Sequence, residues 1–247
     1  MKNRFYLVLA AALFLSACAT GPTKVQESLS HYKSGLNRME SGNDESALYE
    51  FNMAIAENPR NIDAHFAAGI IYYKEKNFDK AMDEFKTTIS IDPDFGDGHH
   101  NLGLVYAQKK DFPDAIKEIR KAIDNPVYPT KDQALVNLGY VYDTIGDHEA
   151  AAKSFREALL ATPDNVAAMY SLADQYNKMN NTDEAEKFYK KTIEAAPKNP
   201  QPYFDLGLIY FKQGKSAAAE ESLEKAKQLA PNTDLAAQAD KYLDLLK

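Results

Sequence analysis

The chain has 247 residues, of which 45% are hydrophobic and 26% charged, with a formal net charge of −7. A negative surface repels phosphate backbones and anionic headgroups, so we expect neither nucleic acid nor an anionic membrane surface as a partner of the folded part. The single cysteine excludes an intrachain disulfide. The one long apolar run, residues 5–15, is too short to span a bilayer, which requires about 20 helical residues.

The first seventeen residues have the order of a secretory signal peptide. Lys2 and Arg4 precede the apolar run, and the small residues Ser16 and Ala17 follow it. The next residue is Cys18, and the sequence Leu-Ser-Ala-Cys at 15–18 resembles the bacterial lipobox. The resemblance implies a signal peptide at 1–17, lipidation of Cys18 and a lipidated linker at 18–27. An ordinary secretory signal with a chance cysteine is the alternative.

Lipidation would place the protein in the bacterial cell envelope. Two or three acyl chains at about 0.8 kcal/mol per buried methylene make a lasting anchor, so the protein would be tethered by lipid and not inserted. Ala19 follows the cysteine in place of the Asp that retains many lipoproteins in the inner membrane of enteric bacteria. We therefore expect the outer membrane, with the folded part facing the periplasm.

One pattern recurs six times from Ser28 onward, with steps of 34, 34, 36, 34 and 34 residues. A small residue opens it, an alanine follows after twelve residues, and an apolar residue comes four residues later. The small residues are Gly35, Gly69, Gly103, Gly139, Ala173 and Gly207. This period is typical of tetratricopeptide repeats (TPRs). It predicts an all-α fold, a right-handed TPR superhelix (α-solenoid) of six helix-turn-helix repeats plus a C-terminal capping helix.

The repeat boundaries follow from the turn and helix-stop signals. Proline ends a second helix, because it lacks an amide proton and clashes with the preceding turn. Asn, Asp and Gly residues occupy the expected turns between paired helices. The repeats are predicted at 28–61, 62–95, 96–131, 132–165, 166–199 and 200–231, and the capping helix at 232–247. The third repeat carries a two-residue insertion around 125–130, which is either a tolerated loop or a bend or docking edge.

The sequence carries no pattern that favours catalysis or a cofactor. His31, His65 and His99 share one position of successive repeats. Equivalent positions of stacked helices are about 8 to 10 Å apart, whereas the donor atoms of one zinc site lie about 2 Å from the metal. We therefore expect no metal. No nucleophile-elbow, zinc-protease or P-loop motif is present. We expect no enzyme, no cofactor and no small-molecule substrate.

Protein binding is favoured by the side chains that the repeat phase places on the first helices. In TPR folds these helices line the concave face, and here their exposed positions are rich in apolar and aromatic residues, which dominate interface energies. Several of them could instead pack only between neighbouring helices. The predicted protein-binding groove consists of Tyr32, Phe66, Ile70, Tyr73, His100, Leu104, Tyr140, Tyr170, Phe204, Leu208 and Phe211.

The lipobox, the six repeats and the Tyr-Pro insertion at 125–129 together resemble the TPR-containing outer-membrane lipoproteins that act as pilotins in type IV pilus biogenesis. The resemblance covers residues 1 to about 231, and the insertion with the segment 134–139 is its most specific part. It implies a factor that helps an outer-membrane secretin to reach the outer membrane and multimerise. The alternative is a TPR lipoprotein scaffold for cell-wall hydrolases or for outer-membrane protein assembly.

Overall fold

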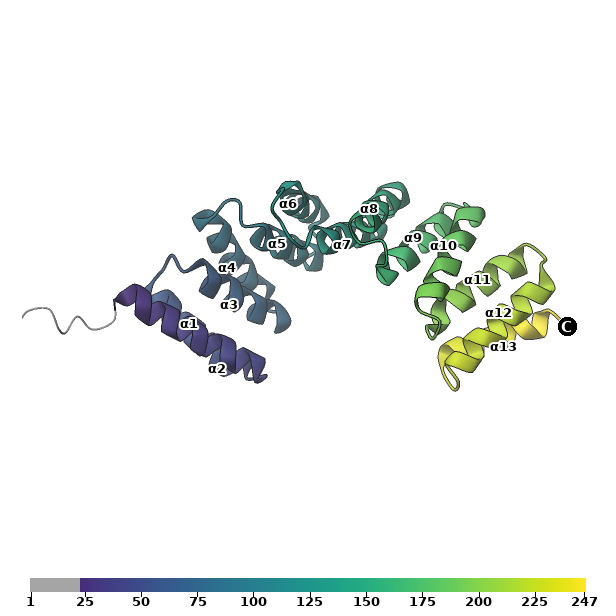
Figure 1. Ribbon diagram of the computed structural model, residues 1–247, viewed down its shortest axis with the longest axis horizontal. Coiled ribbons are helices and arrows are strands. Elements are labelled where there is room, and N and C mark those ends of the chain that lie inside the picture. Colours follow the sequence, from purple (N-terminus) through teal and green to yellow (C-terminus); the bar gives the residue numbers. More distant parts are fainter. Residues whose placement is uncertain (1–22) are drawn as a thin grey trace, which may run out of the picture. The chain divides into compact units, whose positions relative to one another are not determined.

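The computed structural model describes residues 23–247, which form α-helices joined by short turns (Figure 1). The repeats consist of the pairs α1 (Lys24–Glu40) and α2 (Asp44–Glu57), α3 (Ile62–Lys74) and α4 (Phe78–Ile91), α5 (Gly96–Gln108) and α6 (Phe112–Asp124), α7 (Lys131–Thr144) and α8 (His148–Ala161), α9 (Val166–Lys178) and α10 (Thr182–Ala195), and α11 (Pro200–Lys212) and α12 (Ser216–Leu229). The last helix is α13 (Asp234–Leu245). The predicted signal peptide and the predicted lipidation site, Cys18, lie outside the described residues.

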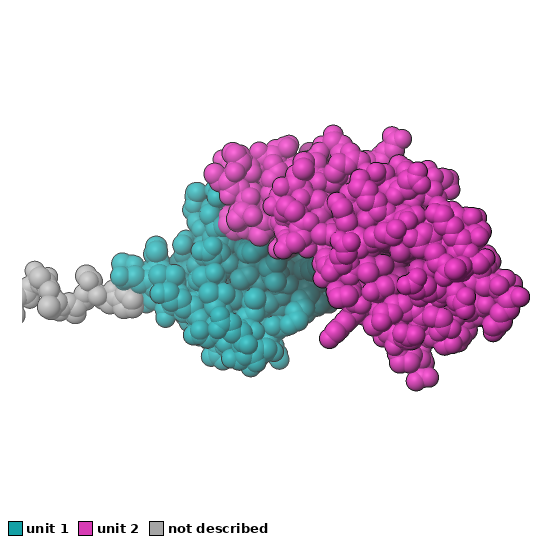
Figure 2. All heavy atoms as spheres, turned by 45° about the vertical axis from the view of Figure 1, so that its right-hand side comes forward, with its two compact units in different colours: residues 1–93 teal, residues 94–247 magenta. Residues whose placement is uncertain are grey.

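The chain consists of two compact units, with the boundary between Pro93 and Asp94 (Figure 2). Unit 1 contains α1 to α4, which are repeats one and two, and unit 2 contains α5 to α13. Within each unit the two helices of a repeat pack against each other, and the second helix packs against the first helix of the next repeat. The all-α, solenoid-like TPR fold predicted from the sequence is confirmed.

Each turn between paired helices contains a residue with positive φ. In the first repeat this residue is Gly42, and the amide of Asn43 donates to the carbonyl of Arg38 at 2.9 Å, which closes a Schellman motif. Asn43 then caps α2 by accepting a hydrogen bond from the amide of Ser46. The equivalent residues of the other five repeats are Lys76, Lys110, Gly146, Asn180 and Gly214.

Proline ends the second helices as predicted. α2, for example, ends at Glu57, and its C-cap Asn58 is extended because it precedes Pro59. The helices α4, α8, α10 and α12 also end two residues before a proline.

The small residue of each first helix lies directly under a large side chain of the second helix. A Cβ atom added to Gly69 would come within 2.6 Å of the Phe85 ring, and one added to Gly139 would come equally close to Phe155. Both phenylalanines are fully buried. The repeat spacing therefore encodes close helix contact, which the sequence pattern required.

The two ends of the chain carry modified elements. The first helix begins at Lys24 with a capping box between Thr23 and Gln26, so residues 24–27 are helical and the linker predicted up to residue 27 is wrong there. At the other end, α13 buries Ala239 and Leu243 against the last repeat. The predicted capping helix is present.

Candidate partner-binding surface

In unit 1 the predicted groove residues lie on the first helices α1 and α3. Tyr32, Phe66, Ile70 and Tyr73 are all half-buried. The ring of Phe66 packs on Phe85 with centroids 5.7 Å apart, and Tyr32 and Tyr73 pack similarly on aromatic rings of the second helices. These side chains therefore support the core with one edge and leave the other accessible.

In unit 2 the predicted groove residues differ widely in exposure. Tyr140 is 43% exposed. Phe204 is buried, because Tyr242 of α13 packs edge-on against its ring and against Phe211. His100 is buried as well. The half-buried members are Leu104, Tyr170, Leu208 and Phe211. The first-helix face of this unit therefore offers Tyr140 as its most accessible aromatic, and partner binding by the eleven residues stays a prediction.

The insertion after α6 explains the burial of His100. Tyr128 turns inward, is 6% exposed, and would be struck by any side chain at Gly96. Its hydroxyl lies 2.9 Å from Nδ1 of His100, and the amide nitrogen of Asn137 donates to Nε2 at 2.9 Å. Because Asn137 donates to Nε2, Nδ1 carries the proton and donates to Tyr128. Burial lowers the pKa of His100 to about 4 and raises the pKa of Tyr128 to about 12. The insertion thus contributes Tyr128 to the core.

The histidines shared by the first three repeats each pair with a glutamate nineteen residues later. Nδ1 of His31 lies 2.8 Å from Glu50, and the matching distance is 2.6 Å in the second repeat and in the third. The other two pairs are His65 with Glu84 and His99 with Glu118. In repeats four to six the same two positions carry Leu135 and Ser154, Met169 and Phe188, and Tyr203 and Ser222. The pairs are therefore structural links between paired helices.

His65 lies between two acceptors, which favours its charged form. Nδ1 faces Glu84 at 2.6 Å and Nε2 faces the carbonyl of Pro59 at 3.1 Å, so only an imidazolium can donate to both. Burial opposes the charge, but the hydrogen bonds to Glu84 and Pro59 outweigh it, and the pKa of His65 is raised above 6.5.

This geometry predicts a pH-dependent contribution to stability. Because the folded pKa of His65 is raised, its contribution is fully present below the ordinary value of 6.5 and is lost as the pH rises through the folded pKa. At about pH 5.5 we expect the melting temperature of the wild type to lie above that of His65→Gln. The difference between the two melting temperatures should be smaller at about pH 8.5. Calorimetry of both proteins measures it. A difference that grows with pH would contradict the charged pair.

A second group of polar side chains in unit 2, which we call the acidic cluster, consists of Tyr170, Asp174, Tyr189 and Asp205. The Tyr170 hydroxyl donates to Asp205 at 2.8 Å, and Gln201 donates to both oxygens of that carboxylate at 3.2 Å. Burial raises the pKa of Asp205, the hydrogen bonds oppose the rise, and the charge of Asp174 adds to it. The cluster thus holds a partly buried carboxylate whose hydrogen-bond donors are neutral.

Tyr189 is the member of the acidic cluster whose hydroxyl lacks a hydrogen-bond partner among the described residues. Tyr189 is fully buried, and within residues 23–247 its hydroxyl is the one buried side-chain polar atom that lacks a hydrogen bond. Burial is the largest cause that raises the pKa of Tyr189, and the charges of Asp205 and Asp174 act in the same direction. Sequence reasoning placed Tyr170 on the groove but missed the cluster. The signal was Tyr189 itself, because the other repeats carry Phe, Ile or Leu at this position.

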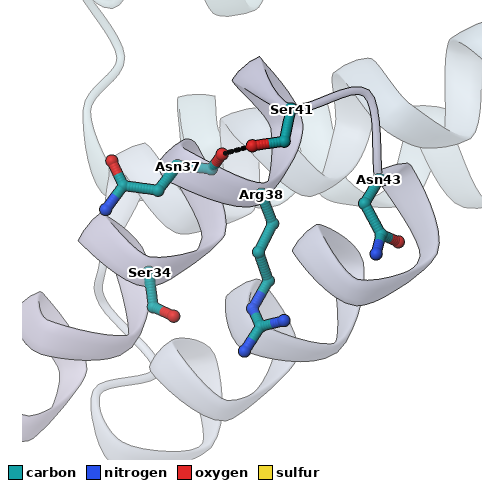
Figure 3. Close-up of a pocket in the computed structure, with 5 residues that line it drawn as sticks. All are labelled: Ser34, Asn37, Arg38, Ser41 and Asn43. Atoms are coloured by element: carbon teal, nitrogen blue, oxygen red, sulfur yellow. Dashed lines mark hydrogen bonds between the residues drawn. The ribbon is translucent and has the colours of Figure 1, made fainter.

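A polar depression of about 400 Å³ lies in the first repeat (Figure 3). Figure 3 shows that Ser34, Asn37, Arg38 and Ser41 of the α1 segment line it, with Asn43 beyond the turn. The guanidinium group of Arg38 forms an ion pair with Glu50 at 3.1 Å. The depression lies where the first repeat carries Ser34 and Arg38, at positions that hold Ala or Leu and Tyr, respectively, in the other five repeats.

The described residues show two further absences. Within residues 23–247, every helix is too short or too polar to span a bilayer. In the same range, no group of three or more His, Cys, Asp or Glu side chains is arranged to hold a metal ion.

Comparison with known proteins identifies the repeats and the fold. Tetratricopeptide-repeat family models match residues 146–201, 180–240 and 97–125, and a TPR-repeat model matches residues 69–110. Together these matches cover more than half of the chain. No curated protein matches it by sequence.

Many solved structures resemble the chain, among them the following three. One comes from a functional characterisation of Pseudomonas aeruginosa PilF, with 18% identity, a TM-score of 0.76, and coverage of 89% of this chain and 99% of that one. PilW, a widely conserved type IV pilus biogenesis factor, has 22% identity, a TM-score of 0.75, and coverage of 86% and 98%. YrrB, a TPR protein with an unusual peptide-binding site, has 19% identity, a TM-score of 0.65, and coverage of 77% and 97%. At these identities the likeness concerns the fold. The chain belongs to the tetratricopeptide-repeat family and has the fold of a protein-interaction scaffold.

Proposed function

We propose that this TPR protein is a lipid-anchored envelope scaffold that binds an outer-membrane secretin and promotes its localisation and multimerisation in type IV pilus biogenesis. The observation that carries the proposal is the end-to-end likeness to PilF and PilW, whose chains are covered to 99% and 98%. The lipobox-like sequence at 15–18 supports the envelope location. A likeness confined to two or three repeats would have supported only generic protein binding.

The first-helix face supports the binding mode. TPR repeats act by presenting rigid helix faces, and accessible aromatic groups supply contact area with little conformational entropy to lose. Tyr140 in unit 2 and the outer edges of Phe66 and Tyr73 in unit 1 are such groups. The exposed acidic surface adds selectivity, since a formal charge of −7 disfavours nucleic acid and anionic lipid as competitors.

Deleting the gene tests the function. We expect loss of detergent-resistant secretin multimers and of surface pili, and restoration of both by the wild-type gene. Normal multimers in the deletion strain would overturn the secretin role and would favour a scaffold for cell-wall hydrolases or outer-membrane protein assembly.

Cys18→Ser tests the anchor in the same strain. The variant should appear in the soluble periplasmic fraction, because the diacylglyceryl group would be attached through this thiol and serine cannot replace it. Wild type is expected in the membrane fraction. Membrane retention of the serine variant would contradict lipidation at this residue.

A further inference from the structure

We propose that the acidic cluster on α9, α10 and α11 binds a cationic side chain, Lys or Arg, flanked by apolar residues in a segment of the partner protein. The inference rests on the proposal that the first-helix face binds a protein, but it does not require that protein to be a secretin.

The first step is the charge balance of the first helices in unit 2. Asp143 on α7, Asp174 on α9 and Asp205 on α11 are three of the five carboxylates on these helices, and the other two, Asp97 and Asp132, lie near the starts of α5 and α7. Lys178 forms ion pairs with two of them, at 2.7 Å from Asp143 and 2.8 Å from Asp174. Among the described residues, Asp205 has no ion pair. Lys212 lies seven residues further along α11, which is about two helical turns away.

The second step is the state of the Asp205 carboxylate. A partly buried carboxylate without a cation is costly to ionise, and the nearby charge of Asp174 adds to that cost. Tyr170 and Gln201 hold the carboxylate in place through hydrogen bonds. Since its two oxygens have about four acceptor sites, the carboxylate can keep these bonds and accept another from an incoming cation. The site is therefore already oriented for a positively charged donor.

The third step is independent of the charges. The hydroxyl of Tyr189 is fully buried without a hydrogen bond, and the groups that act on it electrostatically are Asp205, Asp174 and Tyr170. A buried hydroxyl that has lost its hydrogen bonds to water and gained none in the protein destabilises the fold. Most repeats avoid that cost with an apolar side chain at this position, as Phe51, Phe85 and Phe155 do. The hydroxyl at this one repeat points to a ligand that supplies its missing partner.

The fourth step concerns the flanks of the site. Leu208 is one helical turn beyond Asp205 on α11 and is half-buried. Tyr140 is 43% exposed, and its hydroxyl accepts a hydrogen bond from Ser171 of α9 at 3.2 Å. Apolar residues on either side of the partner's cation would contact these two side chains. The half-buried aromatic ring of Tyr170 can also interact with the cation directly.

An NMR titration of the purified protein with short peptides tests the inference. The probe is a Gly-Ser-Leu-Arg-Leu-Ser-Gly peptide, and the same peptide with Glu in place of Arg is the charge control. We expect saturable shifts at the amides of Tyr170, Asp174 and Asp205 with the Arg peptide only. Shifts confined to other helices, or equal shifts with the Glu peptide, would overturn the assignment. Saturation of the same amides by calcium chloride alone would assign the cluster to a metal ion instead.

Two variants and one control sharpen the test. Asp205→Asn keeps the shape and one acceptor oxygen, which can still accept from Tyr170 and Gln201. It should weaken binding of the Arg peptide by about tenfold or more, because a desolvated charge pair is lost. Tyr189→Phe should weaken binding while leaving thermal stability equal or higher, a split that a purely structural role would not produce. Asp164→Asn, in the exposed turn before α9, should change neither. Unchanged affinity of Asp205→Asn would refute the inference, whereas the secretin phenotype of the deletion strain tests the proposed function separately.

Discussion

Replacing Phe155 with alanine is expected to lower the free energy of unfolding by about 3–5 kcal/mol. The ring is fully buried, lies over Gly139 and packs edge-on against Tyr140 with centroids 5.3 Å apart. Glycine at 139 has no side chain that could fill the cavity. Since each repeat is stabilised by its neighbours, the loss should also affect the rest of unit 2. Urea unfolding followed by circular dichroism measures it.

Leu160 provides the matched control on the same helix, α8. This leucine is 80% exposed. Leu160→Ala should change the free energy of unfolding by no more than about 0.5 kcal/mol. Equal losses in the two variants would show that the phenylalanine is not the packing residue of its repeat.

Replacing Tyr128 with alanine is also expected to lower the free energy of unfolding, again by about 3–5 kcal/mol. The same substitution in an exposed loop would leave stability almost unchanged. Here the ring fills the space beside Gly96, and the hydroxyl accepts a hydrogen bond from His100. Tyr128→Phe keeps the ring and leaves the N–H of His100 without an acceptor, so about 1–3 kcal/mol should be lost. Chemical denaturation of both variants gives the two values.

Val127 is the neighbouring control, because it is 82% exposed. Val127→Ala should leave stability within about 0.5 kcal/mol of wild type. If Tyr128→Ala behaves like Val127→Ala, the insertion is a tolerated loop and the contact with His100 carries no free energy.

The repeat spacing predicted the helices, turns and packing positions because each of these depends on local geometry. In three repeats a glycine in the middle of the first helix and a phenylalanine sixteen residues later mark the close contact of the paired helices, as with Gly69 and Phe85. The start of α1 was missed, although Thr23 and Gln26 form a capping box that the sequence displays.

The missed contacts depend on the path of the chain between repeats. Tyr128 meets His100 only because the insertion folds back onto α5, and its two extra residues do not determine that direction. The acidic cluster draws side chains from three helices, so no local window contains it. The pairing of His65 with Glu84 was within reach, since the separation of nineteen residues recurs three times.

Site-specific photocrosslinking in living cells tests most directly that the protein acts by binding a partner through its first helices. The crosslinker p-benzoylphenylalanine would replace either Tyr140 on α7 or Leu160 on α8, which are 43% and 80% exposed. A secretin adduct from position 140, with none from position 160, is the predicted result. A secretin adduct from position 160 alone, or from neither position at normal protein levels, would contradict it.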